Sequence, residues 1–377
     1  MLIFAAILAI FVYGMIAAML GTILPDLSKR FKLTPAQNGT IATAQALGLM
    51  IASLAVGPLL DTEGDKIGLI LGLVLIAVAL LALPRAGGYG SIVFLLFLLG
   101  VGGGIVVTGA NALANGAAGE HGATVLNLVN LFFGLGGLLT PFISANVFHG
   151  NWVRLCYTVA VLAVVAIAVH AATAMPAPAP GSGFVITQAG PVLGHPLLFL
   201  LGLLLFLYVS CEVGVWNWLA RHLIAQGIPE SRALNILSLG FALGLLLGRV
   251  AVSPILIHIS PLRVLLGASV AMAITTFLML KTNKPGPAAA LVFVAGLAMA
   301  PVFPTTLAVT GARFPSLPGT AIGFVITCGW AGLAVSSRII GAIAGGDPLR
   351  IRKALMLIPA SSVLMVGLIF AIRAAMH

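Results

Sequence analysis

Apolar segments of about twenty residues follow one another along nearly the whole sequence, separated by short polar connections. An α-helix needs about 20 mainly apolar residues to cross the ~30 Å hydrocarbon core of a bilayer. The sequence therefore predicts an all-α polytopic membrane protein with twelve transmembrane helices. The predicted spans are 2–24, 37–60, 67–84, 91–114, 123–148, 152–172, 197–220, 232–257, 263–281, 288–311, 319–343 and 353–374.

Composition agrees with a lipid environment, because 61% of the residues are hydrophobic and only 7% are charged. Soluble chains carry about 25% charged residues and need polar cover for their surface. The 18 Lys and Arg residues stand singly or in short clusters between apolar segments. The net charge of +10 is therefore expected to reflect loop charge, with no nucleic-acid partner. Cys156, Cys211 and Cys328 lie far apart, so we expect no metal site and no cofactor.

A Pro- and Gly-rich stretch divides the sequence near its middle. It predicts an N-terminal six-helix bundle at 1–172, a central linker at 173–196 and a C-terminal six-helix bundle at 197–377. An internal repeat supports this division, since ALGLMIASLAVGPLL (46–60) recurs as ALGLLLGRVAVSPIL (242–256) with an offset of 196 residues. Two halves of the same polarity are expected to share a binding site near the bilayer midplane.

Between the second and third spans the sequence reads GPLLDTEGDK (57–66). Gly57, Asp61, Gly64 and Lys66 fit the pattern G-x-x-x-D-R/K-x-G-x-R/K, with Thr62 in place of the first basic residue. Further phrases are GVGGGIVVTGANALAN (100–115), LNLVNLFFGLGGLLTP (126–141), YVSCEVGVWNW (208–218) and GLAMAPVFPT (296–305).

These phrases resemble the major facilitator superfamily and, within it, the fucose–galactose–glucose:proton symporter family. The resemblance implies the major facilitator fold and transport of a neutral, hexose-like sugar by alternating access. It also implies a proton or sodium ion as the coupling partner, a monomer, and a bacterial cytoplasmic membrane. Gly57, Asp61, Gly64 and Lys66 would form its conformational motif. The acid expected in the fourth helix falls on Val107, so that the coupling residue must be sought elsewhere.

Glu212 is the acid that the sequence places deep inside a span, about sixteen residues into the seventh. The seven others are predicted at helix ends or in loops. An ionised carboxylate at the bilayer centre costs about 2.5–3.5 kcal/mol, and such residues usually mark an ion or substrate path. We expect Glu212 to couple protons or accept a sugar hydroxyl. A snorkelling or permanently protonated Glu is the structural alternative.

Aromatic and amide side chains add further candidate substrate-binding residues. Tyr208 and Trp216 lie four residues on either side of Glu212 and should share its helix face, with Asn217 one position off. Trp216 could instead belong to an interfacial aromatic belt. The amide candidates could instead join helices. The remaining candidates are Gln45, Asn111, Asn127, Asn130, Thr327 and Trp330, with Asn127 and Asn130 expected on one face.

Two other functions fit an apolar chain of this kind. An efflux transporter of amphipathic molecules would need a cavity lined mainly by Phe, Leu and Met. A membrane-embedded enzyme or sensor would need a catalytic pair or a soluble appendage, and the sequence shows neither, so no enzyme is expected. Two signals disagree on the orientation of the chain in the membrane. The family resemblance implies that both termini lie inside, where the positive-inside rule expects most of the basic residues. Only five basic residues, Arg249 among them, fall on that side, against twelve on the other.

Overall fold

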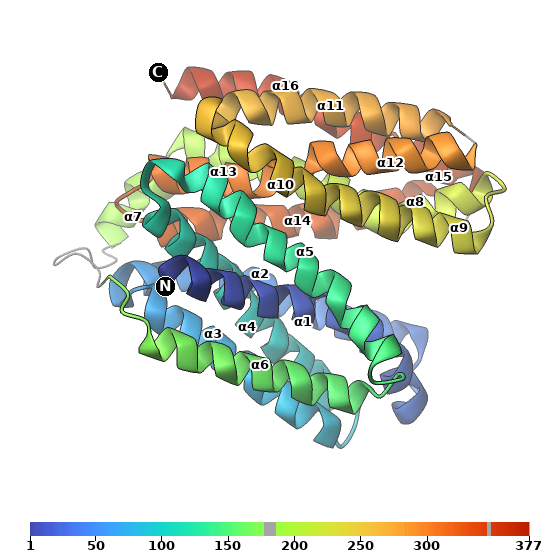
Figure 1. Cartoon of the computed structure of the whole chain (residues 1–377), viewed down its shortest axis with the longest axis horizontal. Coiled ribbons are helices and arrows are strands. Elements are labelled where there is room, and N and C mark those ends of the chain that lie inside the picture. The colour runs from blue at the N-terminus through green and yellow to red at the C-terminus, as the bar shows by residue number, and fades with distance from the viewer. Residues whose placement is uncertain (177–185, 283, 345–347, 377) are drawn as a thin grey trace. The chain divides into compact units, whose positions relative to one another are not determined.

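The computed structural model describes residues 1–176, 186–282, 284–344 and 348–376, and these fold almost entirely into helices (Figure 1). The first half contains α1 Leu2–Phe31, α2 Pro35–Glu63, α3 Asp65–Ala82, η1 Leu83–Arg85, α4 Tyr89–Ala118, η2 Gly119–His121, α5 Gly122–Asn146 and α6 Trp152–Ala172. The second half contains α7 Ile186–Leu193, α8 Pro196–Ala225, α9 Glu230–Asn235, η3 Ile236–Ala242, α10 Leu243–His258, α11 Pro261–Lys281, α12 Pro285–Met299, α13 Val302–Arg313, α14 Pro318–Ala344, α15 Pro348–Leu355 and α16 Leu357–Ala375.

Eleven segments of the described chain are long and apolar enough to cross a membrane. One of them, Tyr89–Asn146, has 58 residues and contains both α4 and α5. Each of these two helices is long enough to span by itself, so the predicted fold class is confirmed and the predicted count of twelve is close to what the structure shows. The chain is a multi-pass integral membrane protein.

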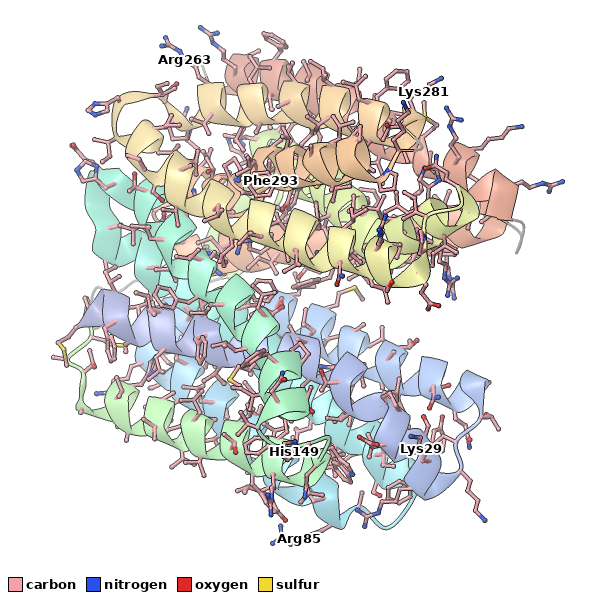
Figure 2. All side chains as sticks on the ribbon, turned by 45° about the vertical axis from the view of Figure 1, so that its right-hand side comes forward. Lys29, Arg85, His149, Arg263, Lys281 and Phe293 are labelled. Carbon is pink, nitrogen blue, oxygen red and sulfur yellow. The ribbon has the colours of Figure 1, made fainter. Side chains whose placement is uncertain are left out.

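Charged and apolar side chains are distributed as a bilayer requires. Lys29, Arg85 and Lys281 lie in the last turns of their helices and Arg263 lies in the first turn of α11 (Figure 2). Large apolar side chains remain exposed along the helix flanks, for example Phe94, Val161 and Leu239. In the absence of a membrane these flanks would be an unusually large apolar surface.

The first helix is longer than its apolar stretch predicts. The predicted span ends at 24, but α1 continues through Pro25 and Asp26 to Phe31. Lys32 then ends the helix in the left-handed conformation, with φ of 51°, and its N–H donates to the Ser28 carbonyl. Apolar length measures only the part of a helix inside the hydrocarbon, whereas capping decides where the helix stops.

Two compact units emerge from the backbone contacts. Unit 1 contains 1–122, 129–193 and 311–327; unit 2 contains 123–128, 194–310 and 328–377. The division into bundles at 1–172 and 197–377 stays a prediction; in the structure segment 123–128 belongs to unit 2 and segment 311–327 to unit 1. Of the predicted linker, 186–193 form α7, while 177–185 lie outside the described residues.

Glycine contacts repeat between the units with the offset seen in the sequence. In unit 1 a Cβ atom at Gly48 would collide with the Phe97 carbonyl oxygen, and in unit 2 a Cβ at Gly244 would collide with that of Phe293. A second pair repeats this contact. A Cβ atom at Gly100 would collide with the Gln45 carbonyl oxygen, and a Cβ atom at Gly296 would collide with the Phe241 carbonyl oxygen. Both pairs are 196 residues apart, so the repeat preserves helix packing and not only apolar character.

Candidate functional site

Glu212 occupies the middle of α8, sixteen residues after Pro196 and thirteen before Ala225. The helix starts cleanly because Pro196 is its first residue and the His195 side chain accepts from the Leu197 N–H. From there α8 runs without a break, with most of its buried residues apolar. The Glu212 side chain is half-buried within this apolar helix.

The aromatic neighbours lie beside Glu212, as their spacing predicts. Tyr208 and Trp216 both interact with the Glu212 carboxyl group. Tyr208 is fully buried, and its hydroxyl has no partner within hydrogen-bonding geometry in the described chain. The Tyr208 hydroxyl next to the carboxylate is therefore available to form a hydrogen bond with a bound solute.

Trp216 offers an aromatic surface next to the carboxylate. Its side chain is 37% exposed, and its ring packs edge-on against Phe241, with ring centroids 5.2 Å apart and an interplanar angle of 76°. Trp216 lies nine residues before the end of α8, well inside the helix. Asn217 is exposed on the next position of α8.

Arg249 is a candidate site residue that the sequence alone does not identify. The sequence predicts it among the basic residues on one side of the membrane, but it belongs to α10 and is only 4% exposed. Its guanidinium interacts electrostatically with Glu212 and with Tyr208. A charge buried in a membrane helix needs a counter-charge or a polar cavity, which Glu212 helps to supply. The available signal was its position inside the apolar repeat ALGLLLGRVAVSPIL.

A π-helix precedes Arg249 in the chain. The segment η3, Ile236–Ala242, has π geometry between α9 and α10, and it carries Phe241, the partner of Trp216. π-helical turns are rare and often accompany functional sites, because they shift the register of side chains on the helix. The sequence does not predict this turn.

Trp330 lies where α14 packs against α8. A Cβ atom at Gly332 would collide with the Phe206 carbonyl oxygen, and the Ser210 hydroxyl donates to the Gly332 carbonyl at 3.1 Å. The Trp330 Nε1 is buried without a hydrogen-bond acceptor in the described chain. Thr327 differs, since it falls in unit 1 and its hydroxyl donates to the Gly323 and Met50 carbonyls at 2.8 and 3.4 Å.

The predicted amides separate into two groups. In unit 1 the Asn130 Nδ2 donates to the Asn111 Oδ1 at 2.7 Å, and the Gln45 Oε1 is buried without a donor among the described residues. In unit 2 the Asn127 Nδ2 donates to the Thr305 hydroxyl at 3.0 Å, while its Oδ1 has no donor there. Asn127 and Asn130, expected on one face of α5, thus have partners on different helices.

Asp61 holds the N-terminal end of α14 within unit 1. Its two carboxylate oxygens accept the Gly319 and Thr320 N–H groups, both at 2.8 Å, and the Thr320 hydroxyl at 2.6 Å. The first N–H groups of a helix have no partner inside the helix and carry partial positive charge, so a carboxylate stabilises them. At Gly57 a Cβ atom would lie 2.5 Å from the Thr320 Cα, so a side chain there would block this approach.

Gly64 and Lys66 complete the 57–66 segment. Gly64 joins α2 to α3 with φ of 86°, a conformation that favours glycine. The Lys66 Nζ donates to the Ala171 and Thr173 carbonyls at 2.7 and 3.1 Å, at the C-terminal end of α6. All four predicted motif residues therefore hold helix ends or helix approaches in unit 1.

The described residues contain no group of three His, Cys, Asp or Glu side chains that could hold a metal ion. The groups around Glu212 are hydrogen-bonding and aromatic side chains together with the Arg249 guanidinium, and such groups suit an organic solute.

Known proteins resemble this chain over most of its length. Among curated relatives, "Protein TsgA homolog" of Erwinia tasmaniensis is 22% identical over 346 residues, covering 88% of this chain and 84% of that protein. Two matches are partial: "Sodium-dependent glucose transporter 1" of Rattus norvegicus is 28% identical over 35% of this chain and 27% of that protein. "4-hydroxybenzoate transporter PcaK" of Pseudomonas aeruginosa is 28% identical over 37% of this chain and 31% of that protein.

Solved structures share the fold at low sequence identity. The transporter FucP, in its outward conformation, gives a TM-score of 0.86 at 17% identity and covers 98% of both chains. The proton:xylose symporter XylE gives a TM-score of 0.79 at 14% identity, covering 98% of this chain and 94% of that one. The family description "Major Facilitator Superfamily" matches residues 6–337. The chain therefore belongs to the Major Facilitator Superfamily.

Proposed function

We propose that the protein is a secondary transporter of a neutral, hexose-like sugar, coupled to a proton or sodium gradient and working by alternating access. The observation that carries the proposal is the Glu212 carboxylate, held in the middle of α8 beside Tyr208, Trp216 and Arg249. We further propose that it acts as a monomer in a bacterial cytoplasmic membrane.

The polar groups around Glu212 suit a sugar. A carboxylate accepts sugar hydroxyls, the Tyr208 hydroxyl can donate or accept, and an indole face such as that of Trp216 packs on the apolar side of a sugar ring. Buried polar atoms rarely stay without partners, so Tyr208 and Trp330 supply groups that a solute would satisfy. Structures of a fucose:proton symporter and a proton:xylose symporter share the fold, which supports the sugar assignment.

Coupling to a cation follows from the charge of the same carboxylate. When a cation neutralises Glu212, its electrostatic interaction with Arg249 weakens and the charge balance between α8 and α10 changes. A symporter must change conformation when both the solute and the cation are bound or when neither is bound. It must not do so with only one of them bound, and a charge switch at the site can enforce this. Glu212 and Arg249 provide the two charges of this switch.

Replacing Glu212 by Gln tests the coupling role. In proteoliposomes, Glu212→Gln should lose accumulation driven by a proton or sodium gradient but keep exchange of labelled for unlabelled sugar, because exchange needs no net cation movement. The sugar is first chosen by thermal-shift screening of hexoses with and without sodium at two pH values. Glu230→Gln, at the exposed start of α9, serves as the control. Gradient-dependent accumulation by Glu212→Gln would overturn the coupling role.

A second candidate substrate is an organic anion. The buried Arg249 favours it, because a guanidinium binds a carboxylate in a bidentate manner. A partial relative is named a 4-hydroxybenzoate transporter. Stabilisation by 4-hydroxybenzoate that is lost in Arg249→Gln, with no stabilisation by any hexose, would favour this candidate over the sugar.

A further inference from the structure

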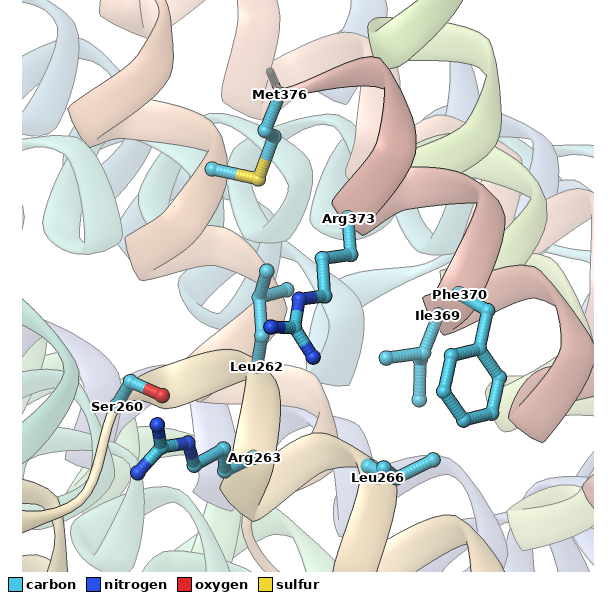
Figure 3. Close-up of a pocket in the computed structure, with 8 residues that line it drawn as sticks. All are labelled: Ser260, Leu262, Arg263, Leu266, Ile369, Phe370, Arg373 and Met376. Atoms are coloured by element: carbon cyan, nitrogen blue, oxygen red, sulfur yellow. The ribbon is translucent and has the colours of Figure 1, made fainter.

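A pocket of about 300 Å³ lies in unit 2 where the start of α11 meets the end of α16 (Figure 3). One part of its wall is polar and carries Ser260, Arg263 and Arg373. The other part is apolar and is lined by Leu262, Leu266, Ile369, Phe370 and Met376. The pocket lies at the ends of two spanning helices, where the hydrocarbon region of a bilayer gives way to its headgroups.

The two arginines bring positive charge to the pocket from different helices. Arg263 is in the first turn of α11 and Arg373 is in the last turn of α16. In Figure 3 the Arg373 guanidinium points from α16 toward α11, and the Arg263 side chain extends toward Ser260, at the polar part of the same wall. Both side chains are exposed, and no hydrogen bond or ion pair joins either guanidinium to another residue in the described part of the chain. Among the described residues, no acidic side chain lines the pocket.

The backbone at this place also favours an anion. Ser260 precedes α11, yet its hydroxyl does not cap the helix. Pro261 follows as the first residue of this 21-residue helix and has no N–H. The Arg263 and Val264 N–H groups donate to the Ser260 carbonyl at 2.9 and 3.2 Å, so the helix contributes through its dipole. The N-terminal end of a helix carries partial positive charge, which adds to the field of the two guanidinium groups.

We propose that this pocket binds the phosphodiester headgroup of an anionic phospholipid in the leaflet on the side of the C-terminus. Arg263 and Arg373 hold the phosphate oxygens, and the Ser260 hydroxyl donates to the headgroup. The exposed Phe370 ring and the half-buried Leu262 and Leu266 side chains contact the upper part of the acyl chains. Basic pockets between transmembrane helices bind anionic lipid headgroups in this way.

The apolar wall assigns the pocket to a lipid and not to a free anion. A soluble phosphate would use the arginines but would leave Phe370, Leu262 and Leu266 without a partner. A phospholipid uses both parts of the wall at once. Its phosphate also lies at the depth of the helix ends, where Arg263 and Arg373 are found.

Native mass spectrometry of the purified full-length protein tests the proposal with phosphatidylglycerol and zwitterionic phosphatidylcholine as probes. Each arginine near an anionic headgroup is worth about fivefold in affinity, so Arg263→Gln/Arg373→Gln should bind the first phosphatidylglycerol about 25-fold more weakly. Arg263→Lys/Arg373→Lys keeps the charge and should retain most of the binding. Arg313→Gln is the matched control, because Arg313 is an exposed arginine in the last turn of α13 that does not line the pocket.

The wild-type protein supplies an independent arm that needs no variant. Phosphatidylglycerol should raise its melting temperature, while phosphatidylcholine and inorganic phosphate at matched ionic strength should not. Equal stabilisation by the two lipids, or stabilisation by inorganic phosphate alone, would overturn the lipid assignment. Unchanged phosphatidylglycerol binding by the double Gln variant would overturn the role of the arginines.

Discussion

Arg249 and Glu212 place opposite charges on α10 and α8, inside segments that are otherwise almost entirely apolar. A buried charge that loses its partner is strongly destabilising, whereas removing both charges costs less, because no uncompensated charge remains. The pair is therefore expected to be coupled in stability as well as in transport.

A double-mutant cycle measures this coupling. Arg249→Gln and Glu212→Gln should each lower the melting temperature of the purified protein, and the double variant should lose less than the sum of the two. The expected interaction free energy is about 0.5–3 kcal/mol, the range found for residues in contact or in one polar network. A cycle of Arg249→Gln with Glu230→Gln is the control and should be additive. Additivity in the first cycle would show that the two charges act independently.

The sequence predicts one of these two charges and not the other. Glu212 stands out because few acids exist and this one lies far from both ends of its apolar span. Arg249 also lies in an apolar segment, but a long basic side chain can extend to the interface from such a position. Only the packing around α10 shows that its guanidinium stays buried.

At the scale of helices, the interaction between Asp61 and the start of α14 shows how a short motif acts on a whole element. Two N–H groups that α14 cannot satisfy by itself are satisfied by one carboxylate of α2. The sequence predicts that Asp61 belongs to a motif, but it does not identify its partner, because the two lie more than 250 residues apart.

Asp61→Ala should therefore loosen the first turn of α14. Loss of a capping side chain typically costs about 1 kcal/mol, and the charge of the carboxylate adds to this effect. Hydrogen exchange followed by mass spectrometry should show faster exchange in peptides that cover Gly319 and Thr320. Glu63→Gln is the control, because Glu63 is an exposed acid in the same helix, two residues away. Unchanged exchange at Gly319 and Thr320 in Asp61→Ala would contradict the capping role.

Helix ends illustrate what apolar length leaves undetermined. The prediction places spans such as α8 and α11 within a few residues, because burial in lipid imposes a length on an apolar helix. The prediction ends the first span at 24 because polar residues follow. The helix α1 itself continues beyond the apolar stretch until Lys32 caps it. The π-helix η3 depends on backbone register, which composition does not encode.

At the scale of the whole chain, the repeat of 196 residues is the feature that sequence and structure share most closely. Gly48 and Gly244 both bring a helix backbone against a carbonyl oxygen, that of Phe97 in unit 1 and that of Phe293 in unit 2. Any apolar residues with this spacing would produce the same offset in the sequence, whatever their contacts. The matched contacts show that the repeat conserves close helix approach at glycine.

Equivalent glycines should therefore respond equally to substitution. Gly48→Ala and Gly244→Ala each place a methyl group on a carbonyl oxygen that belongs to a neighbouring helix backbone and moves only with it. Overpacking of this kind typically costs about 1–3 kcal/mol, so both variants should melt at clearly lower temperature in detergent. The two decreases should be similar, because the partners and the local geometry are repeated.

Two other glycines provide matched controls in helices of the two units. A Cβ atom at Gly39 in α2 or at Gly267 in α11 would meet no other atom within 4 Å. Alanine is favoured over glycine within a helix by about 0.5–1 kcal/mol, so Gly39→Ala and Gly267→Ala should leave the melting temperature unchanged or raise it. A decrease in Gly244→Ala without one in Gly48→Ala would show that the halves share a sequence pattern but not a packing rule. Equal decreases would establish that the repeat is structural.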